Sequence, residues 1–147
     1  MRPIKVIRLD YDLTPTAGLA LVGHQLQALA PVLKALDAAL PMRTGVASSD
    51  IVRSYLGLLV QGKSDFDAIE NVRGDKFYKQ SLGIGLLPSS PTLRQRMDAQ
   101  AVALAAQVPA LIERLLVAGA PDYGVLPCGW LPLDIDTFAM DNSGTAK

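Results

Sequence analysis

The sequence predicts a mainly helical domain with a short strand near each end. Apolar residues recur every three or four positions through most of residues 13–120, as they do on the buried face of a helix. Cap and breaker residues divide this pattern into several helices, and strand-like runs occur only near the termini. With 147 residues, 50% of them hydrophobic, the chain can bury a substantial core, which excludes disordered, collagen-like and rod-like proteins.

Residues 1–12 contain the first predicted strand, which is rich in apolar and β-branched residues. Thr16 is expected to cap the helix that follows, because a threonine hydroxyl can accept a hydrogen bond from a free N–H of the first turn. Pro31 is expected to kink or restart this helix, since proline has no N–H for the helical ladder. The apolar face then continues to Pro41.

Three shorter helices are predicted next. Ser48 or Ser49 caps the first of them, and Gly62 ends it. Ser64 caps the second, whose first turn carries two acids that the helix dipole favours. The third extends over about residues 75–82.

A long helix with the clearest apolar period in the chain is predicted after these. Ser90 is expected to cap it, with Pro91 in its first turn, Pro109 bending it and Gly119 ending it. Its apolar positions follow each other in steps of three or four: Leu93, Met97, Ala101, Leu104, Val108, Leu111 and Leu115. Seven residues are expected to form the centre of the core: Leu26, Leu29, Leu58, Phe66, Leu93, Leu104 and Leu111.

The formal net charge is zero, but the charges are unevenly distributed. Residues 1–96 hold 12 Lys+Arg and 8 Asp+Glu, a balance of +4, and residues 97–147 hold 2 and 6, a balance of −4. With this distribution, the first part of the chain could face phosphates while the acids of the second part serve another purpose. Surface charge that is merely scattered unevenly in solvent is the simpler interpretation.

Five cations are candidate phosphate contacts: Arg73, Lys76, Lys79, Arg94 and Arg96. The last two lie about 200° apart around a helix, so they cannot both face one groove. A short helix, a glycine-containing turn and a serine-capped helix also resemble a helix-turn-helix module in outline. Solvated helix faces are the alternative interpretation of each cation.

A strand interrupted by two acids is predicted over residues 133–140. Asp134 and Asp136 are two positions apart and therefore point to the same face of a strand. Carboxylates among apolar residues suit a site for Mg²⁺ or Mn²⁺. On spacing alone, an acid pair in water or bonded to loop amides is the favoured interpretation.

The remaining compositional features concern the compartment. A single cysteine, Cys128, excludes a disulfide framework and a multi-cysteine zinc site, and it fits a reducing cytoplasm. No signal peptide is visible. Residues 13–33 are uncharged but contain polar residues and prolines, so a buried core helix is expected there rather than a membrane span.

Three segments together resemble the start of bacterial DDE transposases of the insertion-sequence thirteen-eighty type. They are DYDLTPTAGLALVGH, SDIVRSYLGLLVQGKSDFDAIENVRGDKFYKQSLGIGLLPSSPTLRQRMDA and LPLDIDTFAMDNSGTAK. The resemblance covers nearly the whole chain and rests on the order of its parts. It implies a helical DNA-binding region over residues 13–120, followed by the start of an RNase H-like catalytic domain over residues 121–147.

The resemblance also implies a mechanism for the family. Two Asp and one Glu hold two divalent ions, Mg²⁺ or Mn²⁺, for DNA strand cleavage and transfer. The first acid matches Asp136, which Thr137 follows; Asp134 is the second choice and Asp141 the third. The family's second Asp and its Glu lie farther along than Lys147, so this chain alone is expected not to cleave DNA.

The implied partner is the DNA of the element's terminal inverted repeats, in the bacterial cytoplasm at the nucleoid. A homodimer or a complex with full-length transposase is also possible in this interpretation, and no membrane is involved. Two alternatives remain open. One is a truncated transposase that acts as a DNA-binding or dimerising regulator, and the other is an inert remnant or helical interaction domain without DNA affinity.

Overall fold

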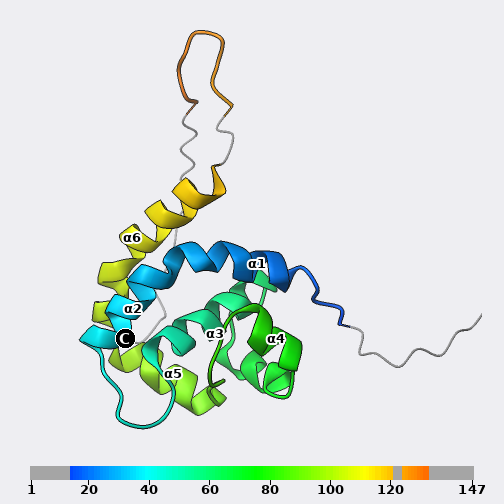
Figure 1. The fold of residues 1–147 in the computed structure, drawn as a ribbon, viewed down its shortest axis with the longest axis vertical. Helices are drawn as coiled ribbons and strands as arrows, with labels where there is room; N and C mark the ends of the chain where they lie inside the picture. Colours follow the sequence, from blue (N-terminus) through cyan, green and yellow to red (C-terminus); the bar gives the residue numbers. More distant parts are fainter. Residues whose placement is uncertain (1–13, 121–123, 133–147) are drawn as a thin grey trace, which may run out of the picture.

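The computed structural model describes residues 14–120 and 124–132, and these residues form an assembly of helices (Figure 1). In chain order the elements are α1 Leu19–Leu26, the 3₁₀ helix η1 Gln27–Leu29, α2 Ala30–Ala39, α3 Ser48–Val60, the 3₁₀ helix η2 Phe66–Val72, α4 Lys76–Ser81, α5 Ser90–Ala99 and α6 Ala101–Gly119. No strand occurs within these ranges, which confirms the mainly helical class. The strands expected in residues 1–12 and 133–140 lie outside the described residues.

The first three helices follow each other almost without interruption and form one curved rod (Figure 1). Pro31 lies in the first turn of α2, where its missing N–H removes no helical hydrogen bond. The predicted restart at this proline is therefore confirmed. The rod begins at Leu19, after Gly18, so the predicted cap at Thr16 is wrong. The backbone carbonyl of Thr16 accepts the Leu19 N–H, but the Thr16 hydroxyl bonds to the hydroxyl of Thr14 and not to the helix.

Several helix starts differ from the predicted caps by one residue. Asp65 caps η2 in place of Ser64, and Ser89 caps α5 in place of Ser90. At the start of α3 no local side chain acts as cap; instead the carboxylate of Asp37, on α2, accepts the Ser49 N–H at 2.8 Å. A sequence pattern detects only local caps, so a cap donated by another helix is invisible to it.

The long helix predicted after residue 90 is two helices. Gln100 interrupts it with φ −109° and ψ 9°, between α5 and α6. The two parts pack differently, because α5 lies against η2 and α3, whereas α6 lies mainly against η1, α1 and α2. Pro109 remains inside α6, which continues to Gly119 as expected.

The core lies where α3 meets the rod, η2, α4 and α5. Leu26, Leu29, Leu58 and Leu93 are buried in it, as predicted. Phe66 and Leu111 are partly buried against it, and Leu104 is half-buried in a surface groove. Two close backbone approaches shape this core: a Cβ at Gly23 would overlap the carbonyl of Ser81, and one at Gly57 would overlap Tyr78 and Leu82.

Candidate nucleic-acid interface

The structure describes the predicted basic site residues but not the predicted acidic ones. Asp134, Asp136 and Asp141 lie outside the described residues. Within residues 14–120 and 124–132, no three His, Cys, Asp or Glu side chains gather in a way that could hold a metal ion. The five basic residues are all described: Arg73 directly follows η2, and the other four lie on α4 and α5.

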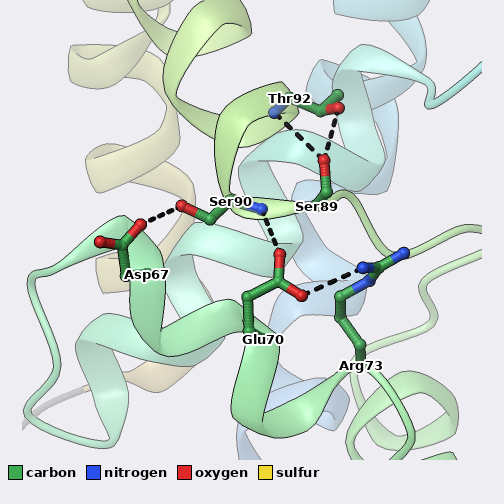
Figure 2. Close-up of polar contacts among 6 residues, drawn as sticks. All are labelled: Asp67, Glu70, Arg73, Ser89, Ser90 and Thr92. Atoms are coloured by element: carbon green, nitrogen blue, oxygen red, sulfur yellow. Dashed lines mark hydrogen bonds and ion pairs between the residues drawn. The ribbon is translucent and has the colours of Figure 1, made fainter.

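Two of these cations flank the junction between η2 and α5, which we call the η2–α5 joint (Asp67, Glu70, Arg73, Ser90 and Arg94). One carboxylate oxygen of Glu70 accepts the Ser90 N–H at 2.7 Å, and the other lies 3.0 Å from Nη1 of Arg73 (Figure 2). The Ser90 hydroxyl donates to Asp67. The backbone hydrogen bond from Ser90, followed by the hydrogen bond from Arg73, lowers the pKa of Glu70 below its usual value.

Arg94 lies on the other side of the same joint. Its guanidinium is 3.6 Å from a carboxylate oxygen of Asp67 and lies 5.6 Å from the centre of the Phe66 ring. The side chains of Arg73 and Arg94 are 50% and 53% exposed, so both guanidinium groups remain open to solvent while each contacts one carboxylate. Such exposed ion pairs are weak, and a phosphate can compete with them.

The two lysines belong to the short helix α4. Asp75 caps this helix by accepting the N–H groups of Phe77 and Tyr78 at 2.8 and 3.1 Å. Lys76 is exposed and lines an open cleft of about 610 Å³, and Lys79 is half-buried. Among the described residues, neither lysine forms an ion pair.

Arg96 differs from the other four because its side chain points into the domain. Its Nη1 donates to the carbonyl of Val46 and its Nη2 to the hydroxyl of Ser48, both at 2.9 Å. These bonds join α5 to the start of α3. A phosphate contact by Arg96 would break them, so four candidate cations remain: Arg73, Lys76 and Arg94, which are exposed, and the half-buried Lys79.

The connection between α4 and α5 does not have helix-turn-helix geometry. A helix-turn-helix joins its helices by a turn of about three or four residues. Here residues 82–89 separate the helices, and α5 packs against η2. The connection is held from α3: Nη1 of Arg53 donates to the Leu82 carbonyl at 2.7 Å, and the Asp50 carboxylate accepts the N–H groups of Gly85 and Leu86. Sequence reasoning missed the roles of Arg53 and Asp50, because their hydrogen bonds join residues about 30 positions apart.

Among residues 14–120 and 124–132, two helical stretches are long and apolar enough to cross a membrane: Leu19–Ala39 and Ala101–Gly119. The core helix of a water-soluble protein satisfies the same criterion, and 39% of the most apolar window of the first stretch is buried inside the domain, against 0% for the second. Length and composition therefore do not establish a membrane location.

Comparisons with known proteins found no relative of this chain. No protein family, curated protein or solved structure matches the chain.

Proposed function

We propose that this chain is the DNA-binding part of an insertion-sequence DDE transposase, the class of enzyme that moves a DNA element by cut-and-paste transposition. The sequence resemblance motivates the proposal. The structural observation that supports it best is a set of four cations near η2, α4 and α5: Arg73, Lys76 and Arg94 are exposed, and Lys79 is half-buried. Two of them carry planar guanidinium groups, which suit the geometry of phosphate oxygens.

The positions of the acids favour the same function. Asp37, Asp50 and Asp75 accept backbone N–H groups inside the domain. Hydrogen bonds from N–H groups and helix N-termini offset part of each negative charge. The lysines, in contrast, have no carboxylate partner among the described residues. The surface near α4 is therefore more attractive to phosphate than the balanced composition indicates.

In this proposal the carboxylate of Asp136 is the first ligand for Mg²⁺ or Mn²⁺, with Asp134 beside it and Asp141 as the third choice. These three residues lie outside the described part of the chain, so this step rests on the sequence alone.

Salt-dependent DNA binding tests the proposal. The full chain is titrated onto a fluorescent mixed-sequence duplex over a series of salt concentrations, and the logarithm of the affinity is plotted against the logarithm of the salt concentration. Four phosphate contacts predict a slope of about −3.6. The double variant Lys76→Ala, Lys79→Ala is expected to bind more weakly, with a slope shallower by about 2.

The matched control is the double variant Lys34→Ala, Arg43→Ala, which removes two exposed cations, one on α2 and one just after it, and is expected to reduce the slope by less than the α4 pair does. Affinity that is absent at low salt, or that falls equally for both variants, would contradict the proposal.

A helical interaction domain without DNA affinity is the second candidate. It is favoured by one observation: α6 has no buried residue and exposes several large apolar side chains. Absence of salt-dependent binding in the same titration would select this candidate.

A further inference from the structure

Two charged side chains of α3 hold the connection between α4 and α5. The carboxylate of Asp50 accepts the N–H groups of Gly85 and Leu86 at 2.9 and 2.8 Å, one on each oxygen. Nη1 of Arg53 donates to the carbonyl of Leu82 at 2.7 Å. Asp50 and Arg53 are three positions apart and therefore lie on the same face of α3. We call these three hydrogen bonds the α3 clamp.

Two glycines let the connection pass directly over the clamp residues. A Cβ at Gly83, whose φ is +64°, would lie 2.7 Å from Nη1 of Arg53. A Cβ at Gly85 would lie 3.1 Å from Oδ2 of Asp50. Either substituent would have to displace the clamp side chain that it meets. The connection is therefore fitted closely to Asp50 and Arg53.

The α3 clamp acts on α4 because this helix ends in the clamped residues. The N–H of Gly83 bonds to the Gln80 carbonyl and the N–H of Ile84 bonds to the Lys79 carbonyl, which is the pattern of a Schellman helix end. Leu82 and Ile84 are both buried. Lys79 lies in the last turn of α4, so the clamp fixes the turn that carries this lysine.

Helix α4 is too short to hold its own geometry. It has six residues, whereas isolated helices shorter than about 12 residues are marginal in water. Asp75 caps its first turn and the ring of Tyr78 is buried, and these contacts keep α4 on the domain even without the clamp. The clamp adds the constraint on the last turn, and with it the direction in which the helix presents Lys76 and Lys79.

We propose that Asp50 is a positioning residue for the two α4 lysines, an inference that rests on the proposed DNA-binding function. Asp50 is buried, so it acts through the connection and not by contact with DNA. Binding is weaker when groups must first be ordered, and lysines on a fixed helix need less ordering than lysines on a mobile turn. The connection also leads into α5, so the clamp sets the spacing between these lysines and Arg94.

Asp50→Asn separates this role from a purely structural one by the sign of its effect on DNA binding. Asparagine presents one oxygen and one NH₂ group, so it cannot accept both N–H groups of the connection. The substitution also removes a negative charge, and by charge alone this raises the affinity for DNA. Loss of positioning lowers the affinity instead. A clamp that only stabilises the fold predicts a lower free energy of unfolding without weaker DNA binding.

Titrations of the full chain onto a fluorescent duplex at matched salt test the proposal. Asp50→Asn is expected to weaken binding about 5-fold. In the Lys76→Ala, Lys79→Ala background the same change is expected to have an effect of less than about 2-fold, because the side chains that it positions are gone. Asp37→Asn is the matched control: it makes the same charge change and breaks a carboxylate bond to the Ser49 N–H, so it should not weaken binding.

Gly85→Ala is a second variant, which keeps the net charge and presses on the Asp50 carboxylate. It is expected to weaken binding only when the α4 lysines are present, and it decides the proposal if circular dichroism shows that Asp50→Asn does not fold. Equal losses with and without the lysines, or unchanged or tighter binding by the folded clamp variants, overturn the proposal and leave the proposed function intact. A wild-type chain that does not bind duplex DNA at low salt overturns both.

Discussion

Tyr78 is the largest side chain that the described helices enclose completely. Its hydroxyl donates to the carbonyl of Ser54 at 2.6 Å, and burial raises the pKa of the phenol above its usual value. Because the folded state favours the protonated form, this contribution to stability is fully present below the unfolded pKa of about 10. It is lost as pH rises from there toward the higher pKa of the folded protein.

Tyr78→Phe therefore separates the hydrogen bond from the packing of the ring. At neutral pH the variant is expected to lose about 1 kcal/mol of the free energy of unfolding, since one hydrogen bond disappears and the ring remains. Urea unfolding at about pH 7 and about pH 11 measures this loss. The difference between the two proteins should narrow at the higher pH, and a difference that stays constant would contradict the role of the phenol.

Single residues also show how far the sequence could predict the candidate site. Periodicity placed Arg94 and Arg96 on different sides of a helix, and the structure agrees. It could not show which side faces inward, because the acceptors of Arg96, the Val46 carbonyl and the Ser48 hydroxyl, come from residues about 50 positions earlier. Such long-range partners leave no local signal.

At the scale of elements, the approach of α1 to α4 depends on one glycine. Gly23 is buried, and a Cβ there would overlap the backbone carbonyl of Ser81, which cannot rotate away as a side chain can. Gly23→Ala is therefore expected to push the two helices apart and to lower the free energy of unfolding by about 2 kcal/mol or more.

Gly18→Ala, at the N-cap of the same helix, is the control. Nothing lies within 4 Å of a Cβ at Gly18, so this variant should change stability by less than about 1 kcal/mol. Thermal or urea unfolding of both variants measures the contrast. Equal effects on the two variants would show that the close approach to Ser81 does not set the cost of Gly23→Ala.

Element boundaries were predicted well where they depend on local chemistry and poorly where they depend on packing. Gly62 and Gly119 lie at or just beyond the ends of α3 and α6, as expected. The apolar period continues unchanged through Gln100, so it gave no sign that the helix is interrupted there. The same period overestimated the burial of Leu104, because α6 lies at the edge of the domain and buries no residue fully.

At the scale of the whole molecule, the helical domain has nearly equal numbers of positive and negative side chains, but these are not evenly distributed. Residues 14–120 hold 10 Lys+Arg and 8 Asp+Glu, a balance of +2. Several acids accept backbone N–H groups. Asp67 and Glu70 also contact the arginines of the η2–α5 joint. In the proposed function, DNA phosphate must displace these carboxylates from Arg73 and Arg94.

Glu70→Gln tests this competition while the fold is kept, because a glutamine oxygen can still accept the Ser90 N–H. Loss of the carboxylate charge frees Arg73, so the affinity for duplex DNA is expected to rise several-fold at low salt, with the gain shrinking as salt screens it. Glu113→Gln makes the same chemical change on α6, away from the joint, and is expected to have a smaller effect. Fluorescence anisotropy titrations at matched salt compare the two variants. If both raise the affinity equally, overall charge rather than the local contact with Arg73 controls binding; if neither does, the η2–α5 joint is not a phosphate-binding surface.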